Sequence, residues 1–174
     1  PDIEYYWNES MVNILILDKE NNELYLKKIV TFFQVLEFEN MSYGIIKKMF
    51  DNGFDSIKKI LLITKEHLIQ IDGFKSTLTN KIYNNIHKII DNPIKLSNLM
   101  AASLCFGHGF GIKKFNSILD IYPNILDIKV NIEMLNQIEG FSDKTSNKFV
   151  ENISYFKDFL ENLDFLKIEI IKKK

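Results

Sequence analysis

Apolar residues recur along this chain at helical spacing, and short polar breaks separate one apolar stripe from the next. At residues 68–76 a stripe ends in an Ile-Asp-Gly-Phe turn, and a second stripe opens with Lys and Ser. The same sequence pattern recurs at residues 135–142 and, in altered form, at residues 106–111 and 35–42. A turn that recurs between two amphipathic helices is typical of a helix-hairpin-helix motif. We therefore interpret the four stretches as four such motifs.

The repeat keeps its register when it is counted from one anchor residue in each turn. The anchors lie 33, 36 and 31 residues apart and are Asn40, Gly73, Gly109 and Gly140. Nine residues after each anchor an apolar residue is expected on the inner face of the next helix, and these residues are Met49, Ile82, Ile118 and Phe149. In the third turn one extra residue moves Phe106 into the apolar position before the anchor. The register predicts an all-α fold of four helix-hairpin-helix motifs, arranged as two packed pairs.

Helices are expected where an apolar stripe follows a capping residue and ends at Gly, Asn or Pro. Around the second turn, one helix should begin at Thr64 and the next should end near residue 90; the helix after the third turn should end near residue 121. Further helices are expected near Ile125 and at residues 26–36, 43–52, 56–62, 96–106, 132–138 and 144–163. Residues 11–17 form a short N-terminal β-prone segment, and residues 24–26 are expected to pair back on it as a hairpin. Apolar and polar residues alternate only loosely in the last ten residues. A strand, a linker and a tail therefore all remain alternatives for this segment.

Pro93 marks the clearest internal boundary, because proline cannot continue a helix and suits the first turn of the next one. We therefore divide the chain into a linker or β-hairpin from an upstream domain, a first motif pair, a second motif pair and a C-terminal tail, at residues 1–27, 28–92, 93–164 and 165–174. The chain opens at Pro1 without Met, so we expect it to be part of a longer protein.

Composition excludes several classes of protein. With 46% hydrophobic and 26% charged residues the chain is globular, and it contains neither an apolar run long enough for a membrane helix nor a signal-peptide pattern. A soluble protein of the cytoplasm or nucleus is expected, without a membrane partner. A single cysteine, Cys105, excludes an internal disulfide and a four-cysteine zinc site. No Walker loop, Ser/His/Asp set, histidine-rich metal set or Lys-x-Asp-Gly adenylation motif occurs, so no catalytic residue, metal ligand or cofactor is assigned to this chain.

The charges are unevenly distributed. Residues 1–40 contain 8 acidic and 3 basic side chains, net −5, whereas residues 41–174 contain 15 acidic and 19 basic ones, net +4. The repeat region is mildly basic, as expected of a module that faces phosphates. All 22 basic residues are Lys, which binds phosphate but does not form the paired hydrogen bonds with which Arg reads guanine. This composition favours binding without sequence preference.

Each turn combines features that a phosphate site needs. Gly, with Asn as second choice, tolerates positive φ and lets an anion approach the backbone. The helix that follows presents unpaired N–H groups and the positive end of its dipole. The candidate DNA-binding residues are Asn40, Ser42, Gly73, Lys75, Ser76, Gly107, His108, Gly109, Gly111, Lys113, Lys114, Gly140, Ser142 and Lys144. For any single turn the alternative is an ordinary tight turn without a ligand.

The order of these features resembles the C-terminal helix-hairpin-helix domain of NAD-dependent DNA ligases. The resemblance covers residues 28–163 and rests on the Phe32-Phe33 helix, the Pro93 junction, and the stretches at residues 68–74, 104–111 and 135–141. It implies four motifs that grip the minor-groove side of nicked double-stranded DNA through backbone amides and nearby side chains. It also implies that NAD, Mg²⁺ and catalysis belong to an upstream adenylation domain, which with an OB domain would be a partner in the same enzyme.

The chain departs from bacterial members of that family, which carry a four-cysteine zinc finger before these helices where this chain has no cysteine. Zinc-free versions resemble viral members, which would also allow a viral factory as the intracellular location. The first turn has Asn40 in place of glycine, so its contact with DNA is not implied. Two other functions stay open: a helix-hairpin-helix DNA-binding domain of another repair or recombination protein, and a module in which paired hairpins dimerise.

Overall fold

The computed structural model describes residues 19–170, with side chains from residue 21 onward. This range is mostly helical, as predicted, and its helices are α2 (Lys19–Val35), α3 (Tyr43–Asp51), α4 (Ile57–Leu61), α5 (Lys65–Ile69), α6 (Ser76–Ile90), α7 (Leu96–Ser103), α8 (Ile112–Ile121), α9 (Ile132–Asn136) and α10 (Asp143–Asn162). Two short strands, β1 (Ile94–Lys95) and β2 (Ile168–Glu169), complete the described part. None of these helices is long and apolar enough to span a lipid bilayer.

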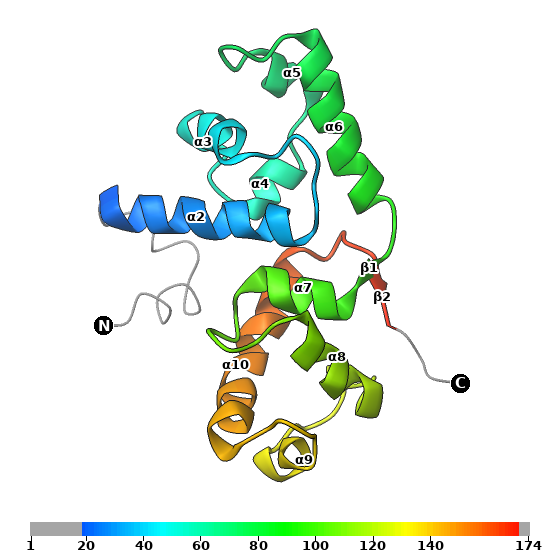
Figure 1. The fold of residues 1–174 in the computed structure, drawn as a ribbon. Coiled ribbons are helices and arrows are strands. Elements are labelled where there is room, and N and C mark those ends of the chain that lie inside the picture. Colours follow the sequence, from blue (N-terminus) through cyan, green and yellow to red (C-terminus); the bar gives the residue numbers. More distant parts are fainter. Residues whose placement is uncertain (1–18, 171–174) are drawn as a thin grey trace.

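The helices form two tiers, with α2–α6 above α7–α10 in the view of Figure 1. Helix α2 packs against α3 in its own tier and against α7 in the other, while α10 packs against α9 and α7. Between the tiers, the ring of Phe32 on α2 meets the ring of Phe159 on α10 edge to face, with centroids 6.0 Å apart. Both rings are buried, so one continuous core joins the tiers and fixes the hairpins of one relative to the other.

A two-residue parallel ladder fastens the junction between the tiers. Strand β1 follows Pro93, and Ile94 pairs with Ile168 of β2. The N–H of Ile94 donates to the carbonyl oxygen of Lys167 (2.8 Å), and Lys167 Nζ donates to the carbonyl oxygen of Asp91 (2.9 Å). The segment after α10 thus returns to the connection between α6 and α7 (Figure 1).

The repeat register places the core as predicted. The position nine residues after each anchor is fully buried in all four motifs, at Met49, Ile82, Ile118 and Phe149. Two predicted helix boundaries are confirmed as well. Thr64 caps α5, with its Oγ1 accepting a hydrogen bond of 3.2 Å from the N–H of His67. Gly53 follows the C-cap of α3 with a φ of +94°, the left-handed form typical of a helix end.

The expected strand at residues 24–26 is wrong, because these residues belong to α2. Their sequence is β-prone, but Tyr25, Leu26 and Ile29 are all buried, and these positions share one face of a helix rather than alternate across a strand. The predicted β-prone segment at residues 11–17 lies outside the described residues.

Two other boundaries differ from prediction. Helix α7 ends at Ser103, earlier than expected, because Leu104 adopts a left-handed φ of +56° and turns the chain into the hairpin. The chain near Ile125 forms turns in place of the expected short helix, with the N–H of Ile125 donating to the carbonyl oxygen of Tyr122 (3.1 Å). Of the alternatives left open for the C-terminal segment, a strand is found at β2.

Candidate nucleic-acid interface

Four hairpins precede helices α3, α6, α8 and α10, and we number them one to four: residues 36–42, 70–75, 104–111 and 137–142. In hairpin two the N–H of Phe74 donates to the carbonyl oxygen of Ile71 (2.9 Å), and Gly73 has a φ of +84°. Hairpin four repeats this geometry, with a corresponding hydrogen bond of 3.1 Å and a φ of +86° at Gly140. Both are β-turns whose third residue needs the positive φ that glycine adopts without strain.

Hairpins one and three share with the other two a positive φ at the anchor residue. In hairpin one Asn40 takes the anchor position with a φ of +59°, as expected of the residue that best replaces glycine there. In hairpin three Gly107 and Gly109 both have positive φ, +76° and +90°. Phe106 fills the apolar position and is 1% exposed, as the register predicted. All four anchors therefore share a positive φ.

The residues predicted to bind DNA lie at the surface of the described chain. Gly107 and Lys114 are half-buried, and the exposed ones are Asn40, Ser42, Gly73, Lys75, Ser76, His108, Gly109, Gly111, Lys113, Gly140, Ser142 and Lys144. A Cβ placed on Gly109 or Gly140 would meet no atom within 4 Å, so the space in front of these turns is open. The geometry makes contact with a ligand feasible, and the role of each residue stays a prediction.

The helices that follow the hairpins differ in how their first N–H groups are satisfied. Ser42 and Ser142 cap α3 and α10, each accepting a hydrogen bond of 3.4 Å from the N–H three residues on. Lys75 and Gly111 hold the same position before α6 and α8 and make no capping hydrogen bond with a side chain. The first turns of α6 and α8 are therefore better suited to an anion than those of α3 and α10.

In the first pair, each motif reaches the hairpin of the other. Lys48 of α3 extends to hairpin two, where a Cβ added to Gly73 would lie 2.9 Å from Lys48 Nζ. Asn85 of α6 extends to hairpin one, where its Nδ2 donates to the carbonyl oxygen of Glu39 (3.2 Å). The two hairpins are thus parts of one unit rather than independent turns.

The second pair makes the corresponding contact through Lys148 of α10, whose Nζ donates to the carbonyl oxygen of His108 in hairpin three (3.2 Å). Sequence reasoning missed Lys48 and Lys148, because a contact between motifs is not visible within one repeat. A signal was present nonetheless, since both lysines lie eight residues after the anchors of their own motifs, Asn40 and Gly140.

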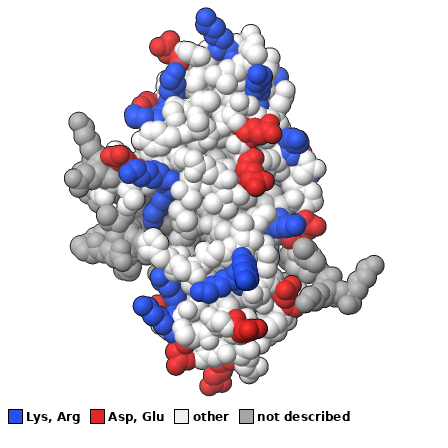
Figure 2. Space-filling view, in the orientation of Figure 1, with Lys and Arg blue, Asp and Glu red and all other residues white. Residues whose placement is uncertain are grey.

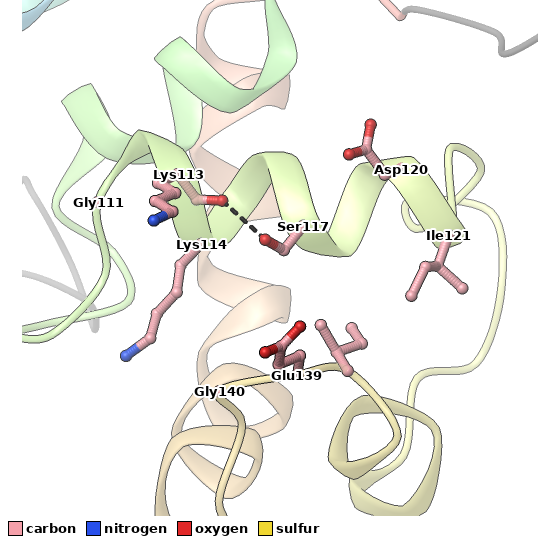
Figure 3. Close-up of a pocket in the computed structure, with 9 residues that line it drawn as sticks. Gly111, Lys113, Lys114, Ser117, Asp120, Ile121, Glu139 and Gly140 are labelled. Atoms are coloured by element: carbon pink, nitrogen blue, oxygen red, sulfur yellow. Dashed lines mark hydrogen bonds between the residues drawn. The ribbon is translucent and has the colours of Figure 1, made fainter.

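Hairpin three also receives a lysine from its own helix. Lys114 Nζ donates to the carbonyl oxygen of Gly109 (2.9 Å) and lies 5.6 Å from the centroid of the Phe110 ring. A groove of about 720 Å³ runs between α8 and hairpin four, and Figure 3 shows Lys113 and Lys114 at the start of α8 with Glu139 on the opposite wall. Its lining residues are Gly111, Lys113, Lys114, Ser117, Asp120, Ile121, Ile138, Glu139 and Gly140.

Charges of both signs lie on the face of the molecule seen in Figure 2. Lysine and acidic side chains are interspersed on the face seen in Figure 2, with uncharged surface between them. In the described part of the chain, lysine–carboxylate pairs one helical turn apart join Lys27 to Glu23, Lys47 to Asp51 and Lys59 to Asp55, at 3.8, 2.6 and 2.8 Å. Pairs this exposed contribute little to stability. This face therefore carries no broad basic field, and the lysines at the hairpins are the local groups that could attract an anion there.

Residues 19–170 contain no group of three or more His, Cys, Asp and Glu placed to hold a metal ion. Cys105 is buried in hairpin three, and burial raises the pKa of its thiol to about 11. The thiol therefore stays protonated at neutral pH and is a poor nucleophile. The ring of His87 packs at a tilt of 38° against the ring of Tyr83, with centroids 4.2 Å apart, in a contact between neighbouring turns of α6.

Comparison with known proteins supplies a family context. No protein-family description and no solved structure matches the chain. It is 42% identical over 166 residues to a protein named "DNA ligase" from Acanthamoeba polyphaga mimivirus, covering 91% of this chain and 26% of that protein. It is 27% identical over 146 residues to "Putative DNA ligase 205R" of Invertebrate iridescent virus 6, covering 83% of this chain and 23% of that protein. The chain spans about a quarter of the length of these relatives, and over most of its own length it is homologous to viral proteins named as DNA ligases.

Proposed function

We propose that this chain binds double-stranded DNA without sequence preference, as the DNA-clamping module of an NAD-dependent DNA ligase that seals nicks in replication and repair. The observation that carries the proposal is the set of four exposed turns whose anchors, Asn40, Gly73, Gly109 and Gly140, share a positive φ before a helix. The names of the viral relatives support the choice of a ligase over other proteins with paired helix-hairpin-helix motifs.

The physical basis is the match between a turn of this kind and a phosphate group. A positive φ without a Cβ lets the phosphate oxygens approach the backbone, and the N–H groups of the next helix donate to them. Because these donors belong to the backbone, they position the duplex without reading its bases. Lysine side chains near the turns add charge, and the absence of arginine is consistent with binding that ignores sequence.

In this proposal NAD and Mg²⁺ act on the adenylation domain of the parent enzyme, not on this chain. This assignment rests on the resemblance, in which a lysine of the adenylation domain is the nucleophile, and the present sequence contains no Lys-x-Asp-Gly motif. The adenylation and OB domains would be the partners of this chain within the same enzyme, acting in the cytoplasm, the nucleus or a viral factory. The chain's own task is to hold the nicked duplex.

The first test is the salt dependence of affinity for a fluorescein-labelled nicked duplex, measured by fluorescence anisotropy with the 174-residue chain. Each phosphate contact should contribute roughly −0.9 to the slope of log K against log salt concentration. Two duplexes of unrelated sequence should give the same affinity. Binding that does not change with salt, or that depends strongly on sequence, would count against the proposal.

The second test replaces the anchor glycines, as Gly73→Val, Gly109→Val and Gly140→Val. A valine strains the positive φ and covers the backbone, so affinity should fall by about threefold or more while helix content changes little. Gly53→Val is the matched control, because Gly53 also has a positive φ (+94°) and a Cβ there meets nothing within 4 Å, but it follows the C-cap of α3 and belongs to none of the four hairpins. Unchanged affinity in all three anchor variants would contradict the proposal.

The alternatives give different results in the same assays. A recombination protein would prefer a branched junction to a nicked duplex, whereas a ligase module should prefer the nicked or intact duplex. A dimerisation module would show twice the monomer mass in a sizing measurement and no salt-dependent DNA binding.

A further inference from the structure

Resting on the proposed function, we infer that hairpins two and three carry most of the phosphate contacts, and that each is completed by a lysine from the other motif of its pair. Lys48 of the first motif serves hairpin two, and Lys148 of the fourth motif serves hairpin three. Hairpins one and four then act mainly as supports from which these lysines extend.

The charges on the hairpins separate the four into two groups. Hairpin one contains two acidic residues, Glu37 and Glu39, and no lysine, while hairpin four contains Glu139. Hairpin three contains no acidic residue, and hairpin two contains Asp72 but also a lysine at its end. A polyanion therefore meets less repulsion at hairpins two and three.

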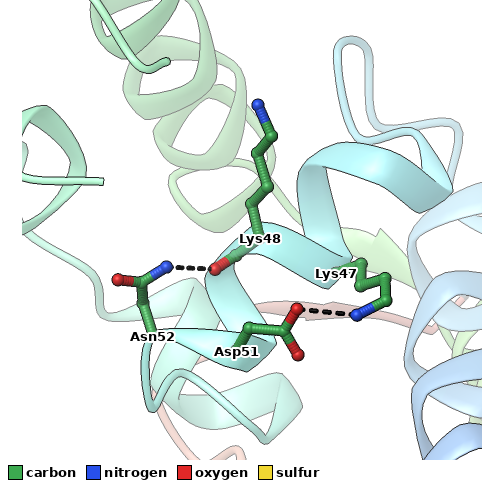
Figure 4. A network of polar contacts seen from close by, with 4 residues as sticks. All are labelled: Lys47, Lys48, Asp51 and Asn52. Atoms are coloured by element: carbon green, nitrogen blue, oxygen red, sulfur yellow. Dashed lines mark hydrogen bonds and ion pairs between the residues drawn. The ribbon is translucent and has the colours of Figure 1, made fainter. Parts of the chain in front are cut away.

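At hairpin two the lysine of the other motif is held beside the anchor. Figure 4 shows Lys47 turned toward Asp51, with which it pairs at 2.6 Å, whereas the Lys48 side chain extends in another direction. Lys48 Nζ lies 5.9 Å from the ring centroid of Phe74 and would be 2.9 Å from a Cβ on Gly73. The ammonium group thus stands next to the glycine corner that precedes the uncapped start of α6.

At hairpin three two ammonium groups converge on neighbouring carbonyl groups. Lys148 Nζ donates to the carbonyl oxygen of His108 (3.2 Å), and Lys114 Nζ donates to the carbonyl oxygen of Gly109 (2.9 Å). Each of these contacts uses one of the three N–H donors of a lysine, which leaves donors for another acceptor. Two like charges this close to one turn repel each other, and a phosphate bound between them would remove that repulsion.

The capping pattern agrees with this division. Ser42 and Ser142 already satisfy one N–H each at the starts of α3 and α10, after hairpins one and four. Beside hairpin four, Asn136 of α9 donates to the carboxylate of Asp143, which keeps an acidic group at the start of α10. The helices after hairpins two and three carry neither a side-chain cap nor an acidic residue in the first turn.

The test compares Lys48→Gln and Lys148→Gln with matched controls on the same helices. Lys47→Gln makes the same charge change beside Lys48 at a lysine already paired with Asp51. Lys157→Gln makes it on α10, nine residues and roughly 13 Å beyond Lys148. Affinity of the 174-residue chain for the nicked duplex is measured against salt, and circular dichroism confirms that each variant keeps its helix content.

The inference predicts that Lys48→Gln and Lys148→Gln each weaken binding about three- to tenfold and reduce the salt slope by roughly 0.9, while both controls stay within about twofold of the wild type. Lys48→Arg and Lys148→Arg should restore most of the affinity, because they keep the charge. Gly109→Val should also weaken binding more than Gly140→Val. If the wild type binds but the Lys48 and Lys148 variants match their controls, the inference is wrong and the proposed function stands. If the wild type shows no salt-dependent binding, the proposed function fails and the inference with it.

Discussion

At the scale of single residues, small differences between repeats reveal what each position does. Ser146 lies six residues after the anchor of hairpin four, and its Oγ donates to Oδ1 of Asn136 (2.6 Å). Thr79 holds the same place after hairpin two, but Ile69 stands where Asn136 would be needed. Among the described residues, Thr79 Oγ1 is a buried oxygen without a hydrogen-bond partner. A polar atom in this state lowers the stability of the fold, because it has lost its hydrogen bonds to water and makes none within the protein.

The first prediction follows from this contrast. Thr79→Val should leave the free energy of unfolding unchanged or raise it by up to about 1 kcal/mol, because it removes an unsatisfied hydroxyl. Ser146→Ala should lower it by about 1 kcal/mol or more, because it breaks a made hydrogen bond. Chemical denaturation of both variants measures the difference. A loss of stability in Thr79→Val as large as in Ser146→Ala would show that the Thr79 hydroxyl has a partner.

At the scale of elements, the repeat made some helices predictable and left others hidden. Helices α3, α6, α8 and α10 could be placed from the sequence, because each anchor fixes a buried position nine residues later. The first two turns of α2 could not, since residues 24–26 were expected to form a strand and the helix was expected to begin only after them. The β1–β2 ladder was equally invisible, because a two-residue strand depends on a partner far along the chain.

The backbone conformation of the hairpin turns could be predicted from the sequence. The contacts between neighbouring hairpins in the candidate site could not. The positive φ of the four anchors followed from residue type, including Asn40 in the altered copy. The contacts of Lys48, Asn85 and Lys148 with the neighbouring hairpin depend on how two motifs pack against each other. The residue types alone indicate which of the four helices begin with a serine cap. The capping difference could be related to phosphate binding only once the contacts of the lysines were known.

Helix α2 carries a second prediction, on stability at alkaline pH. Tyr25 is 2% exposed, and burial, reinforced by the nearby Asp55 carboxylate, raises the pKa of its phenol from 10.0 to about 12. The folded state therefore keeps a proton that the unfolded state releases above about pH 10. This contribution to stability is fully present below about pH 10 and is lost as pH rises toward 12, by roughly 2–3 kcal/mol at most.

Tyr25→Phe removes the ionisable group and should flatten that part of the stability profile, measured by urea unfolding at about pH 9 and about pH 11. Tyr43→Phe is the control, because it removes the same hydroxyl group from a tyrosine that is 39% exposed. If Tyr25→Phe loses as much stability as the wild type between the two pH values, burial of the phenol is not the cause of the alkaline loss.

At the scale of the whole molecule, one shared core joins the two tiers that carry the hairpins. Phe32 and Phe159 join the tiers, and the β1–β2 ladder fastens their connection. In Figure 1 the loop before α6 and the loop between α7 and α8 both project toward the left of the view. These loops contain hairpins two and three, so the hairpins that we assign to phosphate binding open toward one side in this view, one from each tier.

The central claim is that glycine corners and the helix starts behind them bind the phosphates of double-stranded DNA. Its most direct test is a titration of the ¹⁵N-labelled 174-residue chain with a nicked duplex, followed through the backbone N–H signals in two-dimensional NMR spectra. The account predicts that the signals of Lys75, Ser76, Gly111 and Ile112 shift most and lose their response as salt is raised. A duplex that binds while these signals stay in place and others move would contradict it.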